Sequence, residues 1–334
     1  MEIIFLEKNN TGIITLNRPK ALNALNIDMA KIFSEKLQEW NENVNIQRVL
    51  LIGEGKHFCA GGDVKSLYLT KNENNFKEEF FRIEYKLNYL ISQFKKEYLS
   101  IWNGVVMGGG VGLSIYGDHR MATDNTKFAM PETSIGFFPD VGASYFLSNL
   151  PKNVGKFIGL TGQILEVNDL IYLGLATDYF KIENLELLKN NYINSGELIR
   201  ENFEVNNDTE LIKNIELINL MFEGNLNEII SNLENNKSQF SSKILDIIYK
   251  KCPMSLYVST KLINDAKGKS LKECLEIEYQ LSQKLVYRTD FDNGVNTVLV
   301  TKDHNPQWSP AKIDQINTEE LNKYFETHTE KLYL

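Results

Sequence analysis

Two glycine-rich turns are the first feature of this sequence that could support chemistry. They span residues 58–63 (FCAGGD) and 107–112 (MGGGVG), and each follows an apolar stretch typical of a strand. Glycine lets the backbone turn sharply and approach a ligand closely, so amide N–H groups in such turns can point at an oxygen atom. Two such amides from separate turns would form an oxyanion hole. Either turn taken alone is equally well explained as a tight connection between a strand and a helix.

A pair of acids in an apolar segment is the second such feature. Glu132 and Asp140 stand in residues 128–142 (FAMPETSIGFFPDVG), where both have apolar neighbours. A carboxylate buried in such surroundings costs free energy unless it is paired, hydrogen-bonded or used. Both acids are therefore candidates for a general base or a nucleophile. The alternative is a solvated loop with two ordinary surface acids, against which the flanking apolar residues argue.

Other common catalytic motifs fail on spacing. A dinucleotide fingerprint that began at Gly108 would need a glycine at position 113, where Leu113 stands, and the Gly-Lys pair before His57 lacks the Ser or Thr of a P-loop. Neither Ser114 nor Ser144 lies in a G-x-S-x-G nucleophile elbow. Three widely spaced cysteines contain no C-x-x-C pair, which excludes a disulfide scaffold and a zinc domain. Each of the four histidines is interpreted as a surface or packed residue rather than as a catalyst.

The composition limits the remaining classes of protein. The chain has 334 residues, 43% of them hydrophobic, which suits one large α/β domain with an appendage or two modest domains. Its formal net charge of −8 argues against nucleic acid or an anionic membrane as a partner, while a local basic patch for one phosphorylated ligand stays compatible. No apolar run reaches the roughly 18 residues of a membrane span. We therefore expect a soluble, intracellular chain.

The elements that must position the candidate residues alternate between strand and helix in the first part of the chain. The apolar pattern predicts strands at residues 1–8, 12–16, 49–52, 99–106 and 120–122, and helices at 63–93 and from 113. From residue 151 the pattern turns helical, and beyond about residue 184 nearly all of it does, with amphipathic blocks at 210–222, 240–251 and 271–287. This β-β-α-β rhythm predicts a layered α/β domain with a helical C-terminal third.

One helix is predicted in more detail. It begins at Asp28, a residue type that is favoured at the N-cap position. Its apolar residues repeat at three- and four-residue spacing, and they are Met29, Ile32, Phe33, Leu37 and Trp40. We expect this face of the helix to be buried.

These motifs together resemble the crotonase (enoyl-CoA hydratase/isomerase) superfamily, and in particular its 3-hydroxyisobutyryl-CoA hydrolase branch. The resemblance rests on the two glycine-rich turns and on the segment MPETSIGFFPDVG, and it covers nearly the whole chain. Further matching segments lie at 16–25 (LNRPKALNAL), 160–162 (LTG), 253–256 (PMSL), 290–295 (DFDNGV) and 302–308 (KDHNPQW). The resemblance implies an α/β fold: a crotonase-like spiral of β-β-α units over residues 1–185 that binds acyl-CoA, and a helical C-terminal region over residues 186–334 packed on this core.

The resemblance also implies roles for individual residues. The amide N–H groups of Gly62 and Gly109 correspond to the two oxyanion donors of the family. The Pro-Glu position puts Glu132 beside the thioester carbonyl. The Pro-Asp position puts Asp140 near the acyl hydroxyl group or the attacking water. Of these four candidate catalytic residues, Gly109, Glu132 and Asp140 are also expected to contact the substrate.

Two more residues are expected to bind the substrate by the same resemblance. Glu84 matches an acid of the branch that contacts the substrate, and Lys65 is a candidate contact for the CoA phosphates. The alternative for Lys65 is an exposed lysine on a helix. The chain departs from the family pattern at Asn293, where Glu is frequent, and at Asn103, where His is common, but neither position belongs to the expected chemistry.

The expected reaction follows from a missing acid. Hydratases of the superfamily resemble one another in placing a second glutamate three residues after the oxyanion glycine, and this chain has Gly112 there. Hydration needs carboxylates on both sides of the double bond, whereas thioester hydrolysis needs an oxyanion hole and one acid that attacks or activates water. We therefore expect hydrolysis of 3-hydroxyisobutyryl-CoA or a close short-chain 3-hydroxyacyl-CoA, as in valine catabolism. CoA is then part of the substrate, and no metal or redox cofactor is expected.

Two other functions stay open from the sequence. An enoyl-CoA isomerase needs only a single carboxylate to move a proton between carbons, and relatives of this branch resemble subunits built into mitochondrial ribosomes. By resemblance, the expected location is the cytoplasm for a bacterial chain or the mitochondrial matrix for a eukaryotic one. A homo-oligomer is compatible with the sequence.

Overall fold

The computed structural model describes residues 1–70, 76–326 and 330–334, and the chain divides into two compact units. Unit 1 consists of Met1–Asp63, Lys86–Ala129 and Ile164–Thr209. Unit 2 consists of Val64–Tyr85, Met130–Gln163 and Glu210–Leu334. The expected division into a core up to residue 185 and a C-terminal region beyond it stays a prediction.

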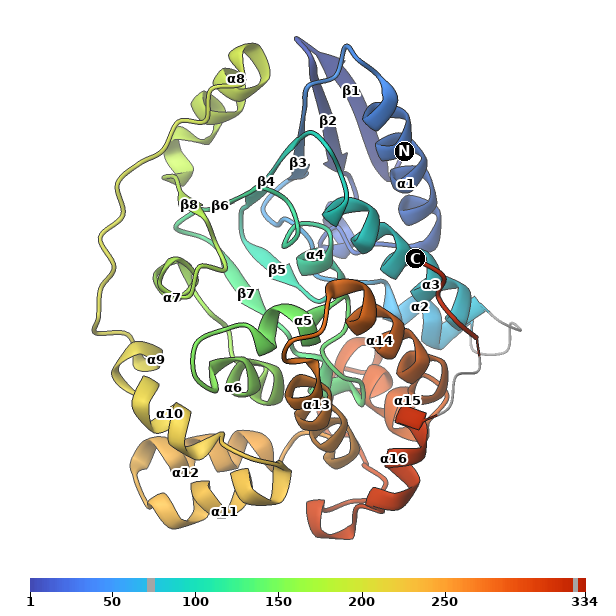
Figure 1. Ribbon diagram of the computed structural model, residues 1–334, viewed down its shortest axis with the longest axis vertical. Helices are drawn as coiled ribbons and strands as arrows, with labels where there is room; N and C mark the ends of the chain where they lie inside the picture. The colour runs from blue at the N-terminus through green and yellow to red at the C-terminus, as the bar shows by residue number, and fades with distance from the viewer. Residues whose placement is uncertain (71–75, 327–329) are drawn as a thin grey trace. The chain divides into compact units, whose positions relative to one another are not determined.

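A six-stranded sheet forms the centre of unit 1. Its strands are, in spatial order, β1 (Ile3–Lys8), β2 (Thr11–Leu16), β3 (Arg48–Gly53), β4 (Glu97–Trp102), β6 (His119–Ala122) and β8 (Asp178–Tyr179). The pair β1–β2 is antiparallel and the other neighbours are parallel. A smaller parallel sheet pairs β5 (Val105–Met107) with β7 (Lys127–Ala129). The strands predicted at residues 1–8, 12–16, 49–52 and 120–122 are confirmed, and Figure 1 shows β1 to β4 side by side. The single strand predicted over 99–106 is wrong, because residues 103 and 104 separate β4 from β5, which belongs to the other sheet.

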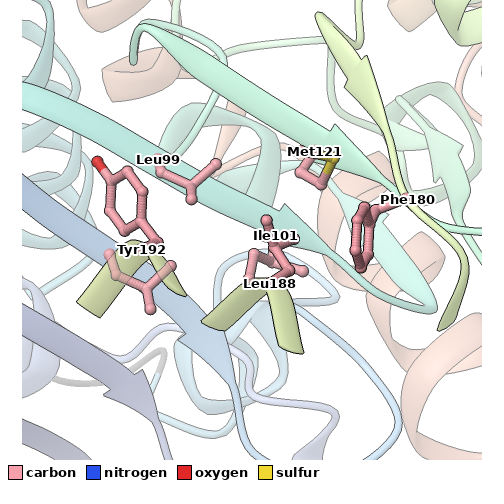
Figure 2. Packing of buried hydrophobic residues seen from close by; sticks show 7 residues of the cluster. Leu99, Ile101, Met121, Phe180, Leu188 and Tyr192 are labelled. Carbon is pink, nitrogen blue, oxygen red and sulfur yellow. The ribbon is translucent and has the colours of Figure 1, made fainter. Parts of the chain in front are cut away.

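The apolar runs of the parallel strands form a core against a later helix. Leu50, Leu99 and Met121 from β3, β4 and β6 are fully buried together with Leu188 and Tyr192 of α8 (Leu185–Ser195). Figure 2 labels four of these side chains, all but Leu50, and shows them packed between the strands and the helix. Strands that are covered on both faces need continuous apolar sequences, which is why the run at residues 49–52 carries no polar residue.

Helix α1 (Ile27–Glu42) differs from its prediction in two details. The N-cap is Asn26, whose side chain accepts a hydrogen bond of 2.9 Å from the Met29 amide, so the prediction of Asp28 as the cap is wrong. Ile32 is 41% exposed rather than buried. The reason is that the buried residues of α1 form one stripe along the helix, and Ile32 lies outside this stripe. The buried residues are Met29, Ala30, Phe33, Leu37 and Trp40.

Three further predicted helices need correction or completion. The long helix expected over 63–93 consists of α2 (Val64–Leu69) and α3 (Phe76–Ser92), with residues 71–75 outside the described ranges. The helix expected from residue 113 is wrong, because the single turn α4 (Gly109–Gly112) ends before that residue and residues 113–116 form turns. Beyond residue 184, α8 stops at Gly196, whose φ of 77° ends the helix, and residues 196–208 are not helical.

Helices dominate unit 2 and the later part of the chain, as predicted. Unit 2 contains α5 (Ala143–Ser148), α6 (Val154–Thr161), α9 (Glu210–Lys213), α10 (Ile215–Met221), α11 (Leu226–Asn236), α12 (Gln239–Ile248), α13 (Pro253–Ala266), α14 (Leu271–Leu285), α15 (Thr289–Val295) and α16 (Thr318–Glu326). Unit 1 adds α7 (Val167–Tyr172). Short helical turns are η1 (Pro19–Ala21), η2 (Glu132–Ile135), η3 (Ile182–Asn184), η4 (Asn296–Val300) and η5 (Ile313–Gln315). Within the described ranges, no helix combines the length and apolar character needed to cross a membrane.

Candidate active site

The two glycine-rich turns lie against each other in unit 1. The backbone of Cys59 pairs with β5, donating to the Val105 carbonyl and accepting from the Met107 amide, both at 3.0 Å. A Cβ atom added to Gly61, whose φ is +114°, would lie 3.3 Å from the Met107 carbonyl oxygen and 3.6 Å from the Gly109 nitrogen. The structure therefore brings the turns at 58–63 and 107–112 together, and the backbone at Gly61 requires glycine.

The amides of both candidate oxyanion donors have no hydrogen-bond acceptor among the residues that the structure describes. Leu25 pairs with the first turn through Gly61 and Asp63, so the Gly62 N–H is skipped by this pairing. Gly109 is the first residue of α4, where helical geometry offers no carbonyl to its N–H. Within the described part of the chain, neither amide donates a hydrogen bond. The sequence could not show this, because it depends on which strand pairs with each turn.

The acids Glu84, Glu132 and Asp140 all belong to unit 2 and are all buried. Glu132 begins η2 and is 6% exposed, as is Asp140. Glu84 lies on α3 and is 2% exposed. The alternative of two ordinary surface acids in a solvated loop is therefore wrong.

Burial changes the acidity of these groups. It is the main reason why the pKa values of Glu84 and Glu132 lie well above the usual range, and the nearby charge of Asp140 raises both further. Burial also raises the pKa of Asp140 to about 7. One oxygen of Glu84 (Oε1) and one of Glu132 (Oε2) have no hydrogen-bond partner among the described residues. Buried oxygens of this kind are available to a substrate or a water molecule.

Asp140 is held by an aromatic hydroxyl group that the sequence did not reveal. The Tyr85 hydroxyl donates a hydrogen bond of 2.7 Å to Asp140 Oδ2, and both side chains are buried. This bond favours the ionised form of Asp140 and partly opposes the effect of burial on its pKa. Tyr85 directly follows Glu84 on α3. The same helix therefore supplies one buried acid, Glu84, and the hydroxyl group that binds another, Asp140.

A fourth buried acid, Glu278 of α14, caps α5. Its carboxylate accepts hydrogen bonds from the amides of Gly142 at 2.6 Å and Ser144 at 3.0 Å, and from the Ser144 hydroxyl at 2.5 Å. Asp140 provides no side-chain cap to this helix. Burial raises the pKa of Glu278 to about 8, although these three bonds favour its ionised form. The signal for Glu278 in the sequence is an acid three residues from both Leu275 and Leu281 on an apolar helix face.

Comparison with known proteins identifies the family. A model of the enoyl-CoA hydratase/isomerase family matches residues 11–325. The chain belongs to this family. It is 37% identical over 342 residues to the mitochondrial 3-hydroxyisobutyryl-CoA hydrolase of Homo sapiens, covering 98% of this chain and 89% of the relative. The corresponding protein of Danio rerio is 38% identical over 346 residues, with 99% and 91% covered.

Solved structures of the family confirm the crotonase-like α/β fold. A carnitinyl-CoA dehydratase from Mycobacterium thermoresistibile superimposes with a TM-score of 0.92 at 32% identity, over 99% of this chain and 98% of the other. An enoyl-CoA hydratase from Rhodobacter sphaeroides 2.4.1 gives a TM-score of 0.91 at 28% identity, over 97% of both chains. The names of these family members include both hydration chemistry and thioester hydrolysis, so the fold alone does not select the reaction.

The remaining expected positions in this family member lie as follows. Lys65 is exposed on α2, and both interpretations of it stay open. Gly112, the position at which the resemblance places the second glutamate of a hydratase, is buried in α4. Asn293 donates a hydrogen bond of 3.0 Å to the Gln307 carbonyl, and Asn103 accepts a weak one of 3.4 Å from Thr123. Both departures from the family pattern therefore have structural partners.

We expect the burial of Glu278 to make the stability of the protein depend on pH. Because its pKa is about 8 in the folded chain and 4.5 ordinarily, the folded state holds an additional proton between these values. The free energy of unfolding should therefore fall as pH rises from about 5 to about 8. In Glu278→Gln this fall should be shallower, because the amide does not titrate. Urea unfolding at several pH values measures the free energy of unfolding and its slope against pH.

The matched control is Glu319→Gln, which changes an exposed acid of α16. It should keep the wild-type slope of unfolding free energy against pH. An identical slope in wild type and Glu278→Gln would contradict the assignment of Glu278 as a protonated buried group.

Proposed function

We propose that this chain hydrolyses the thioester bond of 3-hydroxyisobutyryl-CoA, releasing 3-hydroxyisobutyrate and CoA, a step of valine catabolism. The observation that carries the proposal is Glu132, a buried carboxyl group with one unpartnered oxygen in a chain that has Gly112 at the position of the second hydratase acid. The named relatives from Homo sapiens and Danio rerio support the same substrate.

The proposed chemistry divides between amides and one acid. The N–H groups of Gly62 and Gly109 stabilise the negative charge that develops on the thioester oxygen. Glu132 either attacks the carbonyl carbon or removes a proton from the attacking water. In both routes the carbon–sulfur bond breaks and the CoA thiolate takes up a proton to leave as its thiol. If Glu132 attacks, the acyl group is first joined to it as an anhydride, which water hydrolyses to the free acid and Glu132. If Glu132 activates water, the proton that it removes is passed to the leaving sulfur. Hydrolysis changes no oxidation state, so the reaction requires no redox cofactor, and CoA enters as part of the substrate.

Three side chains are proposed to bind the substrate. Asp140 accepts a hydrogen bond from the 3-hydroxyl group, and Glu84, with its unpartnered oxygen, contacts the acyl portion. Lys65 is the candidate contact for the CoA phosphates. The proposed location is the mitochondrial matrix in a eukaryote, in agreement with the names of the relatives, or the cytoplasm in a bacterium.

An enoyl-CoA hydratase or isomerase activity is the second candidate function, because the solved relatives are named as a dehydratase and a hydratase. Gly112 argues against hydration, since a second carboxylate is needed to position the water. A single carboxylate suffices for isomerisation.

The test of the proposed function is thiol release from a panel of acyl-CoA esters, measured beside assays for hydration and migration of a double bond. We expect free CoA from 3-hydroxyisobutyryl-CoA and little change in enoyl-CoA substrates. Double-bond chemistry without thiol release would contradict the proposal. Co-sedimentation with ribosomal particles, together with no turnover of any ester, would favour the structural role.

Glu132→Gln should lower turnover of 3-hydroxyisobutyryl-CoA by about a hundredfold or more, because an amide neither attacks nor accepts the proton. Affinity for CoA and the thermal unfolding midpoint should stay close to wild type. Glu35→Gln, an exposed acid on α1, is the control and should keep full turnover. Wild-type turnover in Glu132→Gln would exclude Glu132 as the catalytic acid.

Asp140 should determine whether the substrate hydroxyl group is recognised. Isobutyryl-CoA leaves the buried Asp140 without its ligand, so its kcat/KM should be about tenfold or more below that of 3-hydroxyisobutyryl-CoA. Because burial raises the pKa of Asp140 to about 7, this ratio should grow as pH rises through about 7, where the stronger ionised acceptor forms.

In Asp140→Asn the ratio of the two kcat/KM values should shrink. Tyr85→Phe is the matched control, because it removes the hydrogen bond to Asp140 and leaves the carboxylate in place. This control should retain the preference for the hydroxylated ester. A ratio in Asp140→Asn equal to that of wild type would exclude the specificity role.

A further inference from the structure

A lysine of unit 2 is attached to the short turn that begins with Glu132. Lys251 lies between α12 and α13, and its Nζ donates a hydrogen bond of 2.7 Å to the Ser134 hydroxyl group. The amide of the next residue, Cys252, donates a bond of 3.0 Å to the Thr133 carbonyl. Consecutive residues of one segment thus hold consecutive residues of η2, directly after Glu132.

The ammonium group of Lys251 also lies close to the residues that precede Glu132. A Cβ atom added to Gly162 would be 3.0 Å from Pro131 Cα, 3.4 Å from the Met130 carbonyl oxygen and 3.6 Å from Lys251 Nζ. Lys251 therefore packs beside the same few residues of backbone on both sides of Glu132. The absence of a side chain at Gly162 leaves the space in which this packing is possible.

The charge of Lys251 has no close counter-ion in the part of the chain that the structure describes, since its hydrogen-bond partner is the neutral Ser134 hydroxyl. Burial lowers the pKa of Lys251 to about 8, and the charge of Glu132 acts in the opposite direction by favouring the ammonium form. At neutral pH the lysine is therefore mostly charged. Its cost of burial is offset only in part, by Glu132 at longer range.

The groups that face Glu132 otherwise make it harder to ionise. Asp140, Glu84 and Glu278 are all acids, and each raises the pKa of Glu132. Lys251 also borders a cavity of about 550 Å³, and the other charged groups in the wall of that cavity are Glu234, Lys312 and Asp314. Lys251 thus both interacts with Glu132 of the buried acidic cluster and lines a cavity of mixed charge.

We propose, building on the hydrolase function proposed above, that Lys251 is a positioning residue whose ammonium group fixes the turn at 132–134 and favours the ionised form of Glu132. An attacking or proton-accepting Glu132 must be ionised, so Lys251 would extend activity to lower pH. Lys251 does not touch the substrate in this proposal, and it acts through Glu132 and Ser134.

The first test compares the pH profile of kcat/KM in Lys251→Met, Lys251→Arg and wild type. In Lys251→Met, which keeps the length and loses the charge, the acidic limb should move up by about half a pH unit or more, with a loss of about threefold or more near pH 6. Lys251→Arg should restore the wild-type limb. The control Lys250→Met removes an exposed charge one residue away and should leave the profile unchanged. An acidic limb in Lys251→Met that coincides with wild type would overturn the proposal.

The second test needs no activity. Because linkage is reciprocal, Glu132 must raise the pKa of Lys251 if Lys251 lowers that of Glu132. NMR titration of the Lys251 side chain, assigned with Lys251→Arg, should give a lower pKa in Glu132→Gln than in wild type. Equal values would overturn the proposal even if Lys251→Met did not fold. A wild type that releases no thiol would count against the hydrolase function, and the NMR comparison would still decide the role of Lys251.

Discussion

The removal of carboxyl groups from water is the constraint on which unit 2 depends. Glu84, Glu132, Asp140 and Glu278 are all buried, and isolated carboxylates in such surroundings would be strongly unfavourable. Glu278 is compensated by the amides at the start of α5 and Asp140 by the Tyr85 hydroxyl. Glu84 and Glu132 each keep an oxygen that no described residue satisfies. The free-energy cost of burial is therefore least compensated at Glu84 and Glu132.

The glycine-rich turns of unit 1 do not depend on buried charged groups. They present backbone amides, so their chemistry needs no titratable side chain and no change in pKa. Gly61 permits the close approach of the two turns, and the pairing of Leu25 passes over the Gly62 amide. Solved relatives named as a dehydratase and as a hydratase share the fold of this chain, so the fold alone does not select the reaction.

Local patterns explain how much of this could be predicted from the sequence. The apolar run at 49–52 predicted a strand that is buried on both faces of the sheet. The segment 128–142 predicted buried acids because apolar residues flank Glu132 and Asp140. Details that depend on the competition between nearby residues were wrong: Asn26 rather than Asp28 caps α1, and Ile32 lies outside the stripe. The partners Tyr85, Glu278 and Lys251 could not be predicted, because each reaches its contact from 55, 136 or 117 residues away in the chain.

We expect burial to keep carboxyl groups of this cluster protonated near neutral pH. Infrared spectroscopy tests it most directly, because protonated and ionised carboxyl groups absorb at different frequencies. At about pH 6 the wild type should show absorption from protonated carboxyl groups, since the pKa values of Asp140 and Glu278 are about 7 and about 8. This absorption should decrease separately in Asp140→Asn and in Glu278→Gln. A spectrum at that pH with ionised carboxylates alone would contradict the account.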